Sequence, residues 1–272
     1  MKLNKLAAVL AASTMFASGA AMAEPFYINV ANFDTGLTSV GIFGTDGVTG
    51  DIFKMNTVIN ATSTYTDDFG AAGLSVGDSV VDSGFGNITG YYGSGGLFTT
   101  AEDNEGLNGT HALRFEYDDL TGKVAVIDPG ISPIGILAKY TSGTIDVYGD
   151  ANDAANERLL MSLNIFDSAG TVGNAIIYAT VSNIDVNSFF FVDGTDWSDV
   201  VVAINMRFDT NVDPLKDPEF VGLNEAGQSV YVRSSELDGS VEFNRVPEPG
   251  ALALLGIGLV GLGAARRMKK AA

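Results

Sequence analysis

The sequence contains no cysteine and very little histidine, tryptophan or positive charge. It has one His, one Trp and 15 Lys or Arg among 272 residues. Thiol catalysis, Fe–S clusters and zinc–thiolate centres all require cysteine, so they are excluded. A Ser-His-Asp triad would have to use His111, but no Gly-x-Ser-x-Gly motif accompanies it. We therefore predict a non-enzymatic protein with no catalytic residue and no histidine-based metal centre.

The N-terminal residues have the pattern of a secretory signal peptide. Lys2 and Lys5 provide positive charge, and an apolar stretch of small residues follows from Leu6 to Ala20. Ala21-Met22-Ala23 then matches the A-x-A site at which signal peptides are cleaved. We therefore predict a signal peptide over residues 1–23, export through the Sec translocon, and a mature chain that starts at Glu24.

The C-terminal residues 246–272 form a second targeting segment. Val246-Pro247-Glu248-Pro249 precedes an uncharged run from Gly250 to Ala265, and a basic cluster that includes Arg266 and Arg267 follows. As a helix, this run of 16 residues is about 24 Å long, so it spans a bilayer only with snorkelling basic side chains or local thinning. The basic cluster should remain cytoplasmic. We therefore predict a single C-terminal transmembrane helix that holds the protein in the inner membrane before processing.

These three ordered features resemble the PEP-CTERM sorting domain, which is the substrate of exosortases. The features are the Pro-Glu-Pro motif, the run rich in Gly, Leu and Ala, and the terminal Arg/Lys patch, all within residues 246–272. The resemblance implies that an exosortase cleaves near Val246-Pro247-Glu248-Pro249. It also implies a secreted or cell-surface protein of the extracellular matrix. Pro247 and Pro249 disfavour helix around Glu248, which keeps the motif extended and accessible.

Removal of both targeting segments makes the remaining chain more acidic. Residues 24–246 retain nine Lys or Arg against 32 Asp or Glu, a net charge of −23 compared with −18 for the whole chain. Such a surface repels nucleic acid and anionic lipid, so we predict no nucleic-acid partner. It attracts divalent cations or cationic surfaces, although solubility alone also accounts for much of the acidity.

The body of the chain reads as short strands separated by turns. Runs rich in Val, Ile, Phe, Tyr and Thr are broken by Gly, Asp, Asn and Ser, as at Thr121-Gly122, Ser168-Ala169-Gly170 and Asp238-Gly239. The predicted strands are 26–33, 51–59, 79–85, 87–92, 110–117, 122–128, 134–140, 144–148, 159–166, 175–181, 188–192, 200–208, 229–233 and 240–245. One helical turn fits within residues 150–160. The pattern predicts an all-β fold in one domain over residues 24–245, most similar to a jelly-roll β-sandwich, with a barrel as the alternative.

We predict no cofactor, although two acidic segments could bind calcium. Asp, Asn and Glu are dense between Asp146 and Glu157, and Asp67-Asp68 to Gly77-Asp78 forms an acidic, Gly-rich loop. Neither keeps the EF-hand order, and ordinary polar turns have the same composition. Paired carboxylates such as Glu116 with Asp118, or Glu102 with Glu105, resemble a glycosidase pair, but a chain with so many acids contains such pairs by chance.

Aromatic clusters could instead form a platform for sugar rings. These are Tyr91-Tyr92, Phe189-Phe190-Phe191 and Trp197, for which burial in the core is the alternative. Parts of the body are also similar to flocculation-associated PEP-CTERM proteins. The similar segments are Leu74 to Gly84, Asp103 to Leu107 and Ser142 to Tyr148. Relatives have a fuller Asp-rich loop before the first of these, and Phe69, Ala71 and Ala72 interrupt it here.

The resemblance implies a function outside the cell. We expect an exported structural or adhesive protein that promotes flocculation or biofilm aggregation together with exopolysaccharide. The alternatives are a carbohydrate-binding module that uses exposed aromatic side chains and a secreted glycan hydrolase.

Overall fold

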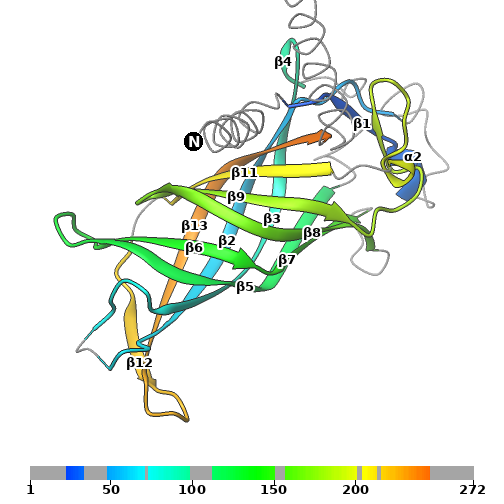
Figure 1. Ribbon diagram of the computed structural model, residues 1–272. Coiled ribbons are helices and arrows are strands. Elements are labelled where there is room, and N and C mark those ends of the chain that lie inside the picture. The colour runs from blue at the N-terminus through cyan, green and yellow to red at the C-terminus, as the bar shows by residue number, and fades with distance from the viewer. Residues whose placement is uncertain are drawn as a thin grey trace, which may run out of the picture.

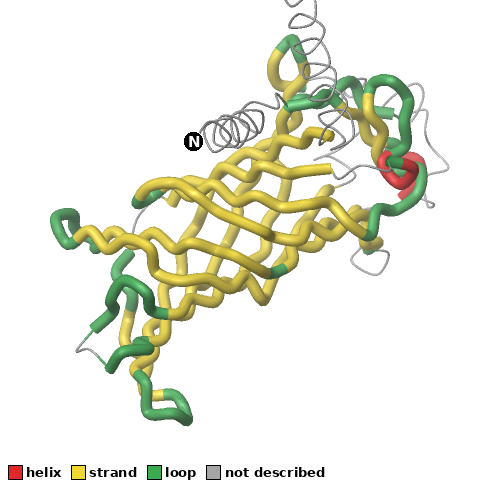
Figure 2. Tube along the Cα trace, viewed as in Figure 1, coloured by secondary structure: helices red, strands yellow, loops and turns green. Residues whose placement is uncertain are grey.

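The computed structural model describes residues 23–33, 48–70, 73–98, 112–150, 157–200, 204–212 and 216–245, and these form strands almost throughout (Figures 1 and 2). The elements are β1 (Phe26–Ile28), α2 (Val30–Phe33), β2 (Lys54–Thr66), β3 (Ser79–Gly93), β4 (Gly96–Leu97), β5 (Ala112–Asp128), β6 (Gly135–Ser142), β7 (Thr144–Asp150), β8 (Arg158–Thr171), β9 (Asn174–Ser182), β10 (Phe189–Phe191), the 3-10 helix η2 (Trp197–Asp199), β11 (Ile204–Val212), β12 (Glu219–Leu223) and β13 (Ser229–Arg245). The predicted all-β class is confirmed. Residues 30–33, predicted as the end of a strand, are the helix α2 instead.

The main sheet is antiparallel and closes on itself. Around the ring the order is β2, β3, β5, β7, β8, β9, β11 and β13, and β13 pairs with β2 again. Closure depends on the pairing of β3 with β5, which runs from Ser79 opposite Lys123 to Asn87 opposite Arg114. Neighbours in the ring follow one another along the chain, so the connectivity is that of an up-and-down barrel rather than a jelly roll.

Alternation along the strands separates an interior from an exterior. In β2 the odd-numbered residues from Met55 to Tyr65 are buried and the residues between them are more exposed. The period of two places one set of side chains inside the ring and the other outside. The interior is largely apolar, and the exterior carries most of the charge. A ligand that approaches the barrel from outside therefore meets the outward set of side chains.

Several observed strands are longer than predicted because glycines inside them were interpreted as turns. Gly122 lies within β5, and a Cβ atom there would stand 2.3 Å from the carbonyl oxygen of Lys139. Gly239 lies within β13, where a Cβ atom would stand 2.2 Å from the carbonyl oxygen of Asp209. At both positions glycine permits a close approach of neighbouring strands. The predicted turns at Thr121-Gly122, Ser168-Ala169-Gly170 and Asp238-Gly239 are therefore wrong.

The two ends of the barrel differ in what they carry. One end, called here the hairpin end, has the connections 67–78, 129–134, 172–173 and 213–228, the last of which includes β12. The other, called the terminal end, has the start of the described chain near Glu24, the end of β13 at Arg245, and the segment of β10 and η2. In Figure 1, β12 and β1 lie at opposite ends of the barrel, and in Figure 2 most loops lie at these ends.

Aromatic side chains fill the terminal end. Trp197 is 0% exposed, and its ring centroid lies 5.1 to 5.2 Å from those of Phe26, Phe189, Phe191 and Phe243. The small sheet of β1 and β10 pairs Phe26 with Phe191 and supplies three of these rings. The cluster closes one end of the barrel with side chains that come from four separate segments of the chain.

The interior near the hairpin end is polar. Asp82 of β3 accepts a hydrogen bond from the hydroxyl of Tyr140, and the side chain of Arg233 from β13 is buried close by. These three side chains line a small internal cavity of about 50 Å³. Burial raises the pKa of Asp82 to about 6, although Tyr140, Ser63 and Arg233 all act in the opposite direction.

The aromatic cluster predicts a large stability effect at Trp197. Trp197→Ala removes a fully buried indole, and we expect the free energy of unfolding to fall by about 3–5 kcal/mol. Trp197→Phe keeps an aromatic ring and should cost less. Chemical denaturation of the two variants measures both values, and an unchanged midpoint for Trp197→Ala would show that this cluster does not close the barrel.

The buried carboxyl of Asp82 predicts a pH dependence of stability. Its pKa is higher in the folded state than the ordinary 3.8, so the folded protein binds more protons between these values. The contribution of the Asp82 carboxyl to the free energy of unfolding is complete below about pH 4. It is lost as the pH rises through about 6, and the total loss is about 3 kcal/mol. Asp82→Asn removes the titration. Denaturation between pH 4 and 7 should show the wild-type curve falling relative to the variant, and parallel curves would contradict the assignment.

Candidate functional site

A row of outward side chains crosses four neighbouring strands of the barrel. Asn60 of β2 stands opposite Phe85 of β3, Phe85 stands opposite Glu116 of β5, and Glu116 stands opposite Asp146 of β7. Directly opposed residues of antiparallel strands project to the same face. Phe85 is 54% exposed, although it is a large aromatic residue in the middle of a strand. The row therefore places one exposed ring between an amide and two carboxylates.

This row lies in a broad, open recess on the outer face. Its lining is rich in hydroxyl, amide and carboxylate side chains, which include Thr62, Ser83, Asp118, Asp119, Thr144, Asn164, Ser182 and Glu236 in addition to the row itself. Such groups donate and accept hydrogen bonds with ligand hydroxyls. An exposed ring beside them offers an apolar surface of matching size to a sugar ring. The recess thus presents hydrogen-bonding side chains and one apolar ring on the same outer face.

The carboxylates of the row are held by neighbouring side chains. Glu116 accepts a hydrogen bond from Arg114 Nη1 at 2.7 Å, and Arg114 Nε also donates to Glu157 Oε1 at 2.7 Å. The hydrogen bond to Glu157 raises the pKa of the Arg114 guanidinium. Asp146 Oδ1 accepts a hydrogen bond from the Ser162 hydroxyl at 2.5 Å. These contacts fix the orientation of both carboxylates, as a binding surface requires.

The predicted hydrolase pair has no special arrangement. Glu116 and Asp118 both belong to the outward face of β5 and both are exposed. Glu116 forms an ion pair with Arg114 Nη1 at 2.7 Å. Glu102 and Glu105 lie outside the described residues, as does His111.

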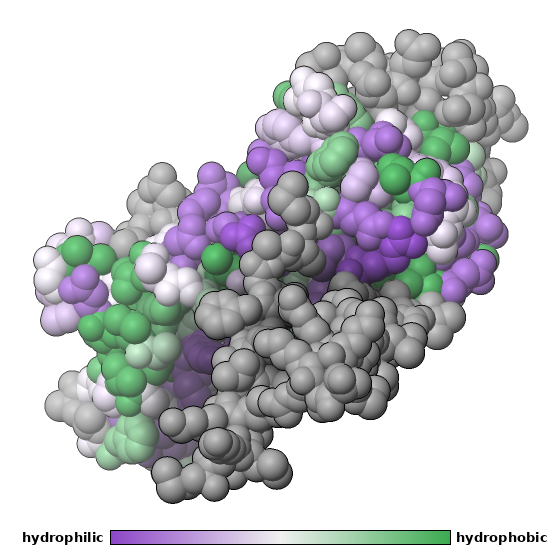
Figure 3. All heavy atoms as spheres, turned by 45° about the horizontal axis from the view of Figure 1, so that its top comes forward, coloured by the Kyte–Doolittle hydropathy of each residue, from purple (hydrophilic) through white to green (hydrophobic). Residues whose placement is uncertain are grey.

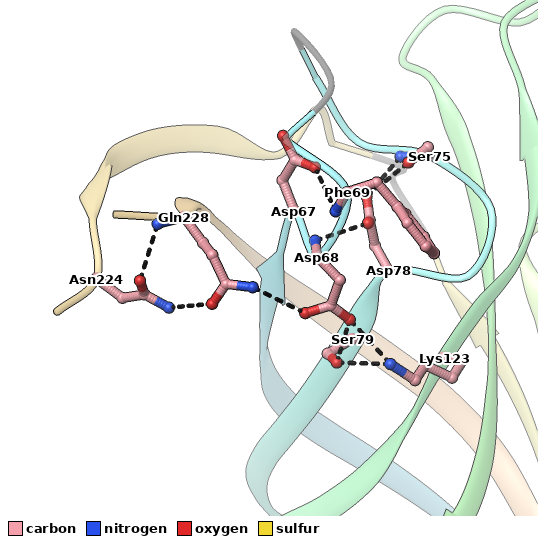
Figure 4. A network of polar contacts seen from close by, with 9 residues as sticks. All are labelled: Asp67, Asp68, Phe69, Ser75, Asp78, Ser79, Lys123, Asn224 and Gln228. Carbon is pink, nitrogen blue, oxygen red and sulfur yellow. Dashed lines mark hydrogen bonds and ion pairs between the residues drawn. The ribbon is translucent and has the colours of Figure 1, made fainter. Parts of the chain in front are cut away.

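The acidic loop 67–78 satisfies its own carboxylates (Figure 4). Asp78 Oδ1 accepts a hydrogen bond from the Asp68 backbone at 3.0 Å, and Asp78 Oδ2 accepts from the Ser75 backbone at 2.6 Å. Asp68 Oδ2 accepts from the Ser79 hydroxyl at 2.6 Å and from Lys123 Nζ at 2.8 Å. The hydrogen bond from Lys123 is the main reason that the pKa of Asp68 lies below its ordinary value.

Backbone amides and a lysine thus occupy the oxygens that a calcium ion would need in this loop. Within the described residues, no three acidic or histidine side chains come together to hold a metal ion. Residues 151–156 of the second predicted calcium segment lie outside them. Gln228 Nε2 lies 3.3 Å from Asp68 Oδ1 and ties the loop to the β12–β13 turn.

The predicted aromatic platform lies mostly inside the protein. Trp197, Phe189, Phe191 and Tyr91 are buried, so Trp197 cannot serve as an exposed sugar-binding residue. Large apolar rings that close an end of a barrel are excluded from solvent by that role. Phe85 is an exposed ring in the recess that sequence reasoning missed. The available signal was its place in the outward set of β3, whose other members Val81, Ser83 and Asn87 alternate with buried residues.

The predicted start and end of the mature domain meet at the terminal end. The backbone N–H of Glu24 donates to the carbonyl of Phe243 at 2.8 Å. Arg245 Nε lies 2.9 and 3.0 Å from the two carboxylate oxygens of Glu24, and Arg245 Nη2 lies 3.0 Å from Asp193 Oδ2. The Arg245 guanidinium also lies over the ring of Phe191, 4.3 Å from its centroid. The hydrogen bond to Glu24 raises the pKa of Arg245, as expected for a firmly paired cation.

The other predicted processing residues lie outside the described part of the chain. These are Ala21, Val246, Pro247, Glu248, Pro249, Arg266 and Arg267. The predicted transmembrane segment, Gly250 to Ala265, lies outside it as well. In the part that is described, no helix combines the length and the apolar character that a membrane span needs.

We expect a substitution in the acidic loop to lower the stability of the protein, and we expect calcium to leave that stability unchanged. Asp78→Asn replaces one acceptor oxygen of a fully buried carboxylate with a donor, which leaves a backbone N–H unpaired and should cost about 1–3 kcal/mol of stability. Millimolar calcium should leave the melting temperature of the wild type unchanged, because a ligand stabilises only a state that binds it. A calcium-dependent rise that Asp78→Asn abolishes would restore the loop as a metal site.

Comparison with known proteins identifies the C-terminal segment. Residues 245–267 match the family model of the PEP-CTERM protein-sorting motif. No curated protein and no solved structure matches the chain. The motif implies sorting by an exosortase, with export to the cell surface or the extracellular space. The chain therefore carries a PEP-CTERM protein-sorting motif, which begins at Arg245.

Proposed function

We propose that this protein is a non-enzymatic component of the extracellular matrix that contacts exopolysaccharide and promotes flocculation or biofilm aggregation. The observation that carries the proposal is the row of Asn60, Phe85, Glu116 and Asp146 in the outer recess. The sorting motif supports it, because an exosortase substrate reaches the surface where exopolysaccharide lies.

The recess suits an extended polymer better than a small ligand. It is open and follows the curved outer face over β2, β3, β5, β7 and β8, so a chain of sugar residues could contact several strands in succession. Each hydrogen bond to an exposed polar group contributes little by itself. A polymer gains affinity from repeated contacts, and that gain needs no deep pocket.

The hairpin end supports a role in aggregation. Phe69, Val76, Phe220, Val221 and Leu223 are 58 to 68% exposed there. On the face drawn in Figure 3, hydrophobic residues gather toward the left end, where turns of the hairpin end lie. An exposed group of apolar side chains often marks a contact surface. With the recess, it gives the protein two surfaces through which it can link matrix components.

A carbohydrate-binding module remains the second candidate, and the exposed Phe85 favours it. The two proposals share the same contact with glycan and differ in whether binding leads to aggregation. Sedimentation of cells measures aggregation, and binding to isolated exopolysaccharide measures the contact, so the two are separated by experiment.

Phe85→Ala should weaken the binding of exopolysaccharide by roughly tenfold, because one aromatic contact is worth about 1–1.5 kcal/mol. Phe166→Ala is the matched control, since Phe166 is 51% exposed on β8 but does not line the recess. Cells that produce the Phe85 variant should also settle more slowly than cells with the Phe166 variant. Equal binding by both variants would remove the recess from the proposal, and release of reducing sugar ends by the wild type would indicate a hydrolase.

A further inference from the structure

The sorting motif begins at a residue that is built into the fold. Arg245 is the last residue of β13 and the first residue of the matched motif. It pairs with Ile204 of β11 in the ladder, and its side chain binds Glu24 and Asp193. The contacts come from three separate parts of the chain, so the position of Arg245 is fixed relative to the whole terminal end. Val246 is the next residue.

The sequence leaves very little chain between this fixed point and the predicted membrane segment. Only the four residues 246–249 separate Arg245 from Gly250. Five Cα-to-Cα steps extend over at most about 18 Å. By comparison, the 17 residues of β13 extend over about 56 Å. The short connection therefore holds the terminal end next to an enzyme that cleaves near residues 246–249, and the hairpin end lies the length of β13 away from Arg245.

The surface beside Arg245 has the composition of a protein contact. Tyr27 of β1 and Phe190 of β10 stack with centroids 5.1 Å apart and planes inclined by 7°, and both rings are partly exposed. Val192 is 45% exposed and adjoins Asp193. Arg245 forms ion pairs with both Glu24 and Asp193, so neither carboxylate is without a cationic partner. Aromatic residues and arginine are enriched in the cores of protein interfaces, from which unpaired charge is depleted.

We propose that the terminal face, defined as Tyr27, Phe190, Val192 and the Glu24–Arg245–Asp193 contacts, docks against the exosortase during processing. Arg245 acts as a positioning residue: it holds the start of the motif at this face, so the enzyme meets the folded barrel together with its cleavage site. The proposal concerns recognition of the folded domain and goes beyond the matrix function. It rests on processing by an exosortase and on the predicted membrane segment.

Site-specific photocrosslinking tests the contact in the full-length precursor. A photoreactive phenylalanine analogue is placed at Phe190 or Val192, and at Phe220 of the hairpin end as a control with 58% exposure. Cells carry an exosortase whose catalytic residue is mutated, so that the precursor accumulates. We expect adducts with the exosortase from positions 190 and 192 and none from position 220. Adducts of equal yield from position 220, adducts with lipid alone, or no exosortase adduct from the terminal face would overturn the proposal.

Two further variants test the role of Arg245 and the short connection. A flexible linker of 20 residues between Arg245 and Val246 should lower the adduct yield at Phe190 by roughly tenfold, because the effective concentration of the barrel near the enzyme falls.

Arg245→Gln should lower the yield and slow cleavage in a pulse–chase experiment, and Arg245→Lys should restore it only in part. The matched control is Arg207→Gln, which removes an ion pair with Asp209 on the outer face of β11. Resistance to added protease shows whether each variant is folded. Unchanged yield and cleavage in a folded Arg245→Gln protein would show that Arg245 does not position the motif.

Discussion

The pairing of β3 with β5 is the interaction on which the rest of the structure depends. It joins the two sides of the sheet from Ser79 opposite Lys123 to Asn87 opposite Arg114, and it leaves no free edge between β3 and β5 along this stretch. Closure gives every strand an inner and an outer face, so Asp82 is buried while Phe85, three residues later, is exposed. The same register places Phe85 next to Glu116. Both the polar interior and the outer recess are therefore consequences of one strand pairing.

Among the described residues, aromatic packing rather than a disulfide closes the terminal end of the barrel. The chain contains no cysteine, and the cluster around Trp197 provides cohesion at this end instead. β1 contributes Phe26 to the cluster, and Glu24, two residues before Phe26, pairs with Arg245. Because these two residues are so close in sequence, the packing of the cluster and the position of Arg245 are coupled. A change that loosens the aromatic cluster should also loosen the point where the sorting motif begins.

Much of the fold follows from local sequence, and the site does not. The strands could be predicted because β-branched and aromatic runs alternate with polar residues, as in β2 and β7. β12 escaped prediction because four of its five residues are exposed and no alternation marks it. A glycine in the sequence is compatible with a turn and also with a close approach of two strands. Composition alone does not distinguish the two, as Gly122 shows. The row around Phe85 depends on the register between strands, and no period within a single strand encodes that register.

The acidic loop and the aromatic clusters show why composition alone does not identify a site. Composition counts carboxylates and rings, but function depends on what each one faces. Asp78 faces backbone N–H groups, Trp197 faces other rings, and Phe85 faces solvent. The polar groups of the recess are spread over an outer face, where each contributes a modest amount of binding free energy. Such a surface binds a single small ligand weakly and gains affinity for a repeating ligand. A polysaccharide matrix supplies ligands of the repeating kind.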